Sequence, residues 1–191
     1  MPENTADRRV RKTRALLRQA LIRLMRQKSV QDITVKELCA VCDINRGTFY
    51  LHYTDVAQLL HSIEDELLVE FERVLEHLTP ESTLSGEAPS PAMRSMLELL
   101  AENEDLCRVL LCHNGDLAFV EKVKNVVHQR VFDAWGAQFR SHGLGADYAY
   151  AFIVSGCIGM LQYWLEQPQP MPPREMAAVM ENMIAKGVAG L

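Results

Sequence analysis

Three kinds of catalytic signature are missing from this 191-residue chain. It contains no G-x-S-x-G nucleophile motif, no glycine-rich phosphate loop and no H-E-x-x-H pair. Its carboxylates are scattered, and helical periodicity brings no two of them together in a cleft. These absences leave an enzyme without specific support, so we expect neither catalysis nor a resident cofactor or metal.

The chain also lacks the even number of cysteines that a disulfide framework needs, because it has five. This usage favours a reducing cytoplasm. Cys39 and Cys42 form a C-x-x-C without the second ligand pair of a zinc site, so we expect them to pack in the core. Cys107, Cys112 and His113 form another cluster, for which a thiol sensor or metal site stays open as the alternative to packing.

Long apolar runs are almost absent. The N-terminal residues lack the apolar segment of a signal peptide. One stretch, Tyr148 to Leu165, holds 18 consecutive uncharged residues, which is close to the length of a membrane span. Ser155 and Gln162 interrupt it and no basic residue flanks it, so we expect a buried helix and no membrane segment.

No segment alternates apolar and polar residues as a strand does, so the chain is predicted to be all-α. Helix periods and caps predict about nine helices, at residues 8–28, 35–42, 46–53, 56–78, 92–102, 104–113, 117–139, 147–166 and 173–188. Residues 79–91 contain three prolines, three serines and a glycine, which predicts a loop at a domain boundary.

Charge divides the chain in two. Residues 1–53 hold 11 Lys and Arg against 5 Asp and Glu, whereas residues 54–191 hold 9 against 20. A basic first third on an acidic remainder is typical of a DNA-binding domain attached to a body that does not bind DNA.

The strongest motif lies within that basic third. Thr34 and Glu37 have the spacing of a capping box, which predicts a helix from Val35. Asn45 is a good N-cap for a second helix beginning at Arg46. Only three residues separate the two helices, which is the layout of a helix-turn-helix whose second helix enters the major groove of DNA.

At this point the chain resembles the TetR family of transcriptional regulators, through the pattern ITVKELC…CDINRGTFYLHYTD. The segment SGCIGMLQYWLEQPQPMPPREMA is similar to the C-terminal domains of the DhaS-like subgroup. The resemblance implies a helix-turn-helix domain at 1–54, a connecting helix at 55–78, a loop at 79–91 and a ligand-binding and dimerisation domain at 92–191. It also implies a homodimer, built through the last two long helices, on a palindromic double-stranded operator.

Matching this sequence to the family's pattern position by position implies that eight residues in and beside the two short helices contact DNA. Arg46 is the best candidate to read guanine, because its guanidinium fits two acceptors on one base edge. Val56 stands where the family often has a lysine, which removes one expected phosphate contact. The implied contact residues are Thr34, Lys36, Asn45, Arg46, Gly47, Thr48, Tyr50 and His52.

For the C-terminal domain we expect a pocket near Trp135, Tyr148, Phe152 and Trp164, although core packing explains each aromatic residue equally well. The favoured interpretation is a cytoplasmic repressor whose operator affinity is controlled by an unknown small-molecule effector. The alternatives are control by a protein partner, and a helical carrier or enzyme. A deep apolar pocket would favour a small molecule over a protein partner.

Overall fold

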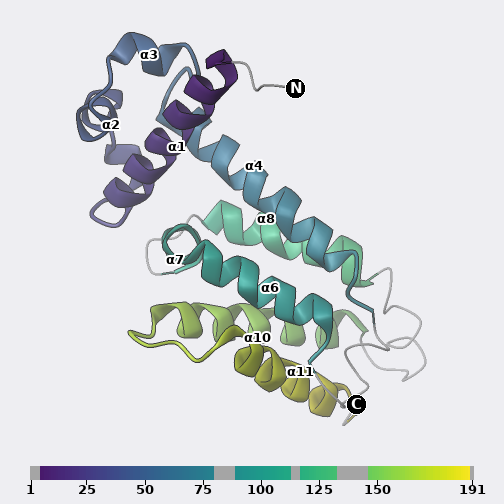
Figure 1. The fold of residues 1–191 in the computed structure, drawn as a ribbon. Helices are drawn as coiled ribbons and strands as arrows, with labels where there is room; N and C mark the ends of the chain where they lie inside the picture. Colours follow the sequence, from purple (N-terminus) through teal and green to yellow (C-terminus); the bar gives the residue numbers. More distant parts are fainter. Residues whose placement is uncertain (1–4, 80–88, 113–116, 133–145, 190–191) are drawn as a thin grey trace. The chain divides into compact units, whose positions relative to one another are not determined.

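The computed structural model describes residues 5–79, 89–112, 117–132 and 146–189, and every regular element in these ranges is a helix (Figure 1). The described residues form nine α-helices, so the prediction of an all-α chain with about nine helices is confirmed. The chain divides into two compact units, Met1–Leu67 and Leu68–Leu191, with the division inside the long helix α4 (Val56–Leu75).

The N-terminal unit is a small helical domain with a tightly packed core. Its largest fully buried side chains come from four different helices, because each short helix turns one apolar face inward. The elements of the unit are α1 (Thr5–Met25), a 3₁₀ turn (Val30–Asp32), α2 (Val35–Cys42), α3 (Arg46–Tyr50) and the first part of α4. The fully buried apolar side chains are Leu17, Leu21, Leu38, Phe49 and Leu59.

α3 ends at Tyr50, three residues earlier than the sequence pattern predicts. The N–H groups of both His52 and Tyr53 donate to the carbonyl oxygen of Phe49, at 2.9 and 3.0 Å. These bonds tighten the chain after α3 into a turn. The turn leads directly into α4 and leaves α3 as a short exposed segment.

The C-terminal unit is a helical bundle in which α11 packs on α6, and α10 packs on both α7 and α11. Its fully buried residues are mostly leucines from α6, α7 and α10, together with Phe119 of α8. The elements are the rest of α4, α6 (Pro91–Glu102), α7 (Glu104–Leu111), α8 (Leu117–Val127), a π-helical turn (His128–Phe132), α10 (Ala146–Glu166) and α11 (Pro173–Ala189).

A buried carboxylate joins α11 to the start of α6. Glu181 is 6% exposed, and its two oxygens accept from the backbone N–H of Ser90 at 2.9 and 2.8 Å. The Ser90 hydroxyl in turn accepts from the N–H of Met93 and caps α6. A negative charge is favourable at a helix N-terminus, so this contact fixes the two helices against each other.

The predicted and observed helix limits agree within a few residues in most of the C-terminal unit. The long helix predicted over residues 117–139 instead ends as an α-helix at Val127 and continues as a π-helical turn. Its remainder, including Trp135, lies outside the described residues. Among the helices that the structure describes, none is both long enough and apolar enough to cross a membrane.

Candidate functional site

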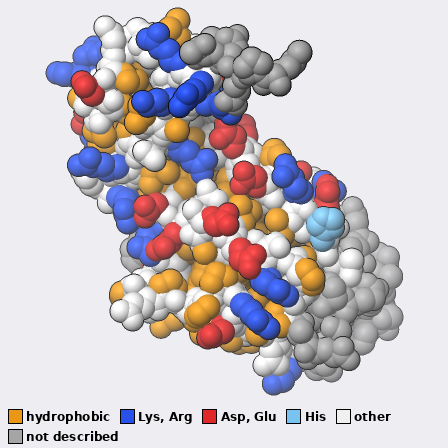
Figure 2. All heavy atoms as spheres, in the orientation of Figure 1, with side chains coloured by type: hydrophobic (Ala, Val, Ile, Leu, Met, Phe, Trp, Pro, Cys, Tyr) orange, Lys and Arg blue, Asp and Glu red, His pale blue; other side chains and the backbone are white. Residues whose placement is uncertain are grey.

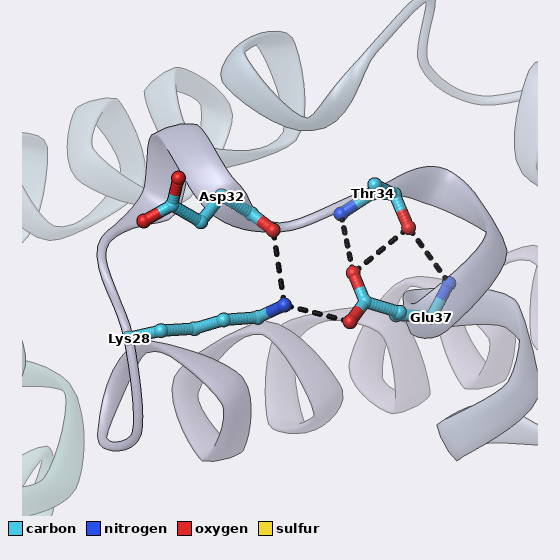
Figure 3. Close-up of polar contacts among 4 residues, drawn as sticks. All are labelled: Lys28, Asp32, Thr34 and Glu37. Carbon is cyan, nitrogen blue, oxygen red and sulfur yellow. Dashed lines mark hydrogen bonds and ion pairs between the residues drawn. The ribbon is translucent and has the colours of Figure 1, made fainter.

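The first helix of the helix-turn-helix is held at its start by a network of hydrogen bonds (Figure 3). The N–H of Thr34 donates to Glu37 Oε2 at 3.0 Å, and Thr34 Oγ1 accepts from the N–H of Glu37 at 3.2 Å. Both bonds of the predicted capping box are therefore present, and α2 begins at Val35 as expected. Thr34 Oγ1 also donates to Glu37 Oε2 at 2.8 Å.

Lys28 extends this network in a way that the sequence analysis missed. Its Nζ lies 2.6 Å from Glu37 Oε1 and donates to the carbonyl oxygen of Asp32 at 2.9 Å (Figure 3). The hydrogen bond from Lys28, followed by those from Thr34, lowers the pKa of Glu37 from its usual 4.5 to about 2. The network therefore ties the start of α2 to the segment that follows α1.

The turn between α2 and α3 has a left-handed residue at its first position. Asp43 has a φ of 53° and a ψ of 47°, which aspartate tolerates better than most residues do. The N–H groups of Asp43 and Ile44 both donate hydrogen bonds to the carbonyl oxygen of Cys39. The chain then reverses, and the Asn45 side chain accepts from the N–H of Gly47 at 2.9 Å. The predicted N-cap of α3 is therefore confirmed.

α3 is anchored by one buried ring and exposes most of its other side chains. Phe49 has no exposed surface, and its ring packs edge-on against Tyr50 with centroids 5.5 Å apart. Tyr53 lies on its other flank at 5.9 Å. Tyr50 is 58% exposed although it contacts this buried ring. The contact with Phe49 therefore restrains the tyrosine side chain while leaving it accessible to solvent.

The predicted DNA-contact residues gather around α3 and the start of α2. Thr34, Lys36, Asn45, Arg46, Gly47 and Tyr50 are exposed, and Thr48 and His52 are half-buried. Arg8, Arg9, Arg11 and Lys12 are also exposed, at the start of α1. On the face that Figure 2 shows, Lys and Arg side chains predominate over the part of the molecule that Figure 1 labels α1 to α3. The N-terminal unit thus carries a basic, polar surface.

Gly47 is not required by the packing of the chain itself. A Cβ placed on it would meet only the Asn45 side-chain oxygen at 3.6 Å, an ordinary van der Waals distance. Glycine nevertheless costs a helix roughly 1 kcal/mol relative to alanine. Gly47 therefore destabilises the helix although no neighbouring atom in the chain requires a glycine there. This is consistent with the close approach of another molecule to the backbone at Gly47.

The C-terminal unit contains an apolar cavity of about 120 Å³. Its walls come from α4, α6, α8, α10 and α11. The contribution of α10 is a stripe at helical spacing, formed by Tyr150, Ile153, Val154, Cys157, Ile158 and Leu161. Among the helices that the structure describes, α10 supplies the most lining residues.

Three of the four aromatic residues that we expected near a pocket, Tyr148, Phe152 and Trp164, are not part of this wall. Tyr148 and Phe152 are 84% and 77% exposed, on the opposite face of α10. Trp164 is buried, and its Nε1 donates to the carbonyl oxygen of Met171 at 2.8 Å. Trp135 lies outside the described residues. The lining residues from Tyr150 to Leu161 recur at i, i+3 and i+4, and this spacing could have identified the face of α10 that lines the cavity. The pattern is hard to recognise in the sequence because the neighbouring positions of this segment are also mostly apolar.

A second apolar surface lies on the outside of α10 and α11. Tyr148, Phe152 and Tyr163 of α10 are exposed, as are Val179 and Met183 of α11. A groove runs beside this surface, and Gly156 and Gly159 are among its lining residues. A Cβ on either glycine would meet nothing within 4 Å, so this notch is open.

Cys39 and Cys42 behave as packing residues, as the sequence predicts. Cys39 is buried, and the Cys42 Sγ donates to the carbonyl oxygen of Leu16 at 3.4 Å. Burial raises the pKa of Cys42 and of Cys112 to about 11, which keeps both thiols protonated at neutral pH. No group of three metal-ligating side chains occurs among the described residues. His113 lies outside them, so the proposed cluster with Cys107 and Cys112 stays open.

Comparison with known proteins gives a consistent result. The family model described as "Transcriptional regulator C-terminal region", of the TetR type, matches residues 87–186. The uncharacterised HTH-type transcriptional regulator YxbF of Bacillus subtilis (strain 168) is 28% identical over 183 residues. That alignment covers 92% of this chain but 45% of YxbF, so the chain spans less than half the length of this relative.

Solved structures show the same fold. The TetR transcriptional regulator from Streptococcus agalactiae 2603V has a TM-score of 0.62 at 22% identity, covering 94% of this chain and 97% of that one. The dihydroxyacetone kinase operon activator DhaS has a TM-score of 0.58 at 13% identity, with the same coverage. The family model covers more than half of the sequence, and the family expected from the sequence pattern is confirmed. The chain belongs to the TetR family of transcriptional regulators.

Proposed function

We propose that the chain binds a palindromic double-stranded operator in the cytoplasm and represses transcription until an effector enters its C-terminal cavity. The observation that carries the proposal is α3, whose buried Phe49 holds Arg46, Tyr50 and their polar neighbours in an accessible position. A short helix that exposes hydrogen-bonding and cationic side chains beyond a tight turn suits the major groove. The basic start of α1 supplies candidates for phosphate contacts.

The proposed contact residues fall into two groups. Arg46, Gly47 and Thr48, on the first turn of α3, are candidates to read base edges. Tyr50 and His52, with Thr34 and Lys36 at the start of α2, are candidates to fix the position of the unit on phosphates. Asn45 contributes indirectly, since its side-chain oxygen already caps α3.

A homodimer through α10 and α11 is part of the same proposal. Tyr148, Phe152 and Tyr163 expose three aromatic rings along a single helix, which is unusual for a surface that remains in water. The open glycine notch beside them lets a second backbone approach closely. Two copies related by two-fold symmetry would present two α3 helices to the two halves of a palindrome.

The cavity favours a small-molecule effector over a protein partner. A protein partner needs an accessible surface, whereas the cavity lies among five helices of one unit. Control by a protein partner would instead require the outer surface of α10 and α11, which the dimer occupies in our proposal. The related fold of DhaS, which is an operon activator by name, makes activation the alternative to repression.

Selection of genomic DNA fragments by the purified protein tests the proposal. We expect enrichment of a palindrome with half-sites about 10 bp apart, or a multiple of this. Arg46→Ala should lose the enrichment, and the matched variant Arg174→Ala, at an exposed position of α11, should keep it. A reporter gene behind the selected operator then distinguishes repression from activation. Equal enrichment by both variants, or none by the wild-type protein, would refute the recognition role of α3.

A further inference from the structure

The cavity of the C-terminal unit has a lining that restricts what can enter it. Among the described residues that form its wall, none carries a charge. The wall is made of aliphatic and methionine side chains with one phenylalanine, one tyrosine and one cysteine. We propose that the effector of this protein is an uncharged, apolar molecule about the size of one aromatic ring or a short alkyl chain. This inference rests on the proposed function, because it takes the cavity to be the effector site.

Among the described lining residues, the two with polar side chains are neutral and offer little to a polar ligand. Tyr150 Oη donates its hydrogen to the carbonyl oxygen of Lys124 at 3.1 Å. Burial raises the pKa of this tyrosine to about 12, and burial also raises the pKa of the Cys157 thiol to about 11. Both groups therefore stay uncharged at neutral pH. An ion in the cavity would lose its hydration and find no opposite charge in the described wall.

Two ionisable groups that lie close in sequence to lining residues, Glu181 and Lys124, already have partners. Glu181 follows the lining residue Met180, and its carboxylate accepts both hydrogen bonds from Ser90. Lys124 precedes the lining residue Val127 by three positions, and its Nζ lies 2.7 Å from Glu121 Oε1. Neither charge is part of the wall. The described wall therefore offers no charged partner to a carboxylate, a phosphate or an ammonium group, and it disfavours their binding.

The volume sets the size of the ligand. A cavity of about 120 Å³ is slightly smaller than an engineered apolar cavity of about 150 Å³ that binds benzene and stays dry when empty. Met93, Met96 and Met180 lie in the wall, and flexible unbranched methionines adapt to ligands of different shape. We therefore expect tolerance toward the shape of apolar ligands and intolerance toward charge.

Toluene, benzoate and benzylammonium form a matched set of probes because they share one ring and differ in charge. We would titrate each into the full-length protein labelled with ¹³C at the methionine methyl groups and follow the NMR signals. Toluene should shift Met93, Met96 and Met180, while Met183, which is 59% exposed and outside the wall, serves as the internal control. Benzoate and benzylammonium should bind at least about 100-fold more weakly, because burying an uncompensated charge is costly.

Two variants with the same substitution locate the site. Val154→Phe fills the cavity and should abolish the toluene shifts, whereas Val69→Phe, on an exposed part of α4, should leave them unchanged. If Val154→Phe fails to fold, the comparison of the three probes on the wild-type protein decides by itself. Binding of either ion within tenfold of toluene, or the absence of toluene shifts at the three wall methionines, would overturn the inference.

Operator affinity, measured with and without toluene, separates this inference from the proposed function. Toluene shifts together with weaker operator binding would support both. Toluene shifts with unchanged operator binding would support the ligand class and contradict control of DNA binding through this cavity.

Discussion

The two units of the chain place their candidate sites in opposite environments. In the N-terminal unit, α3 has five residues, and a single fully buried ring fixes it while its polar side chains face outward. In the C-terminal unit, the 21-residue α10 turns one apolar face to a cavity and leaves aromatic rings exposed on another. A surface that meets a charged polymer must stay in water, whereas a site for an apolar effector must exclude water. Substitutions on the exposed face of α3 should therefore change DNA binding more than stability, whereas substitutions in the cavity wall should change both ligand binding and stability.

The largest expected effect comes from the exposed rings of α10. Phe152→Glu places a charge on the proposed dimer surface of both copies and should raise the dimer dissociation constant at least about 100-fold, since an unpaired buried charge costs several kcal/mol. Operator binding should fall with it. Analytical ultracentrifugation measures the dimer, and Val69→Glu, at a position 59% exposed on α4, is the matched control. A wild-type protein that is monomeric at micromolar concentration would contradict the proposed interface.

The next largest effect should be confined to DNA. Arg46→Ala should cost about 1–3 kcal/mol of operator binding per half-site, while helical content stays unchanged because Arg46 is exposed. Arg46→Lys keeps the charge but loses the planar fork, so it should retain non-specific binding and lose base discrimination. Fluorescence anisotropy with operator and scrambled DNA at one salt concentration measures both. If Arg46→Lys discriminates as well as the wild type does, Arg46 contacts only phosphate.

Sequence patterns predicted the helices that carry the N-terminal candidate site better than they predicted the cavity of the C-terminal unit, for a physical reason. Capping obeys short-range rules, so Thr34, Glu37 and Asn45 located two helix starts correctly. The left-handed conformation of Asp43 and the contact from Lys28 to Glu37 depend on how the elements meet, and local patterns do not contain that information.

The cavity illustrates the opposite case. Tyr148 to Leu165 is apolar on every face, so its periodicity could not say which face points inward. The large aromatic residues were natural candidates for a pocket, yet Tyr148 and Phe152 lie on the exposed face. The buried pair of Glu181 and Ser90 joins residues 91 positions apart, and only the fold brings such residues together.

A smaller effect, with opposite signs for stability and binding, is expected at Gly47. Gly47→Ala should stabilise the protein by up to about 1 kcal/mol, because alanine favours the helix and its Cβ meets no close neighbour. The same methyl group should weaken operator binding if the backbone approaches DNA at this position. Urea unfolding and anisotropy titrations measure the two quantities. A variant that is more stable and binds equally well would show that DNA does not approach Gly47 closely.

The smallest effect should appear at Glu37 and depend on pH. Its folded pKa of about 2 lies below the usual 4.5, so the ionised carboxylate favours the folded state. This contribution is fully present above about pH 4.5 and is lost as the pH falls toward 2. Glu37→Gln removes the charge but keeps an acceptor for Thr34.

The difference in unfolding free energy between wild type and Glu37→Gln should therefore be constant near neutral pH and shrink below about pH 4.5. Urea unfolding at pH 7 and pH 3, in low and high salt, measures it. High salt should reduce the difference at pH 7, because the pair with Lys28 is partly exposed to solvent. A difference that persists unchanged at pH 3 would show that the ionisation of Glu37 is not the source of its contribution to stability. The ion pair between Lys28 and Glu37 would then contribute nothing measurable to the stability of the N-terminal unit.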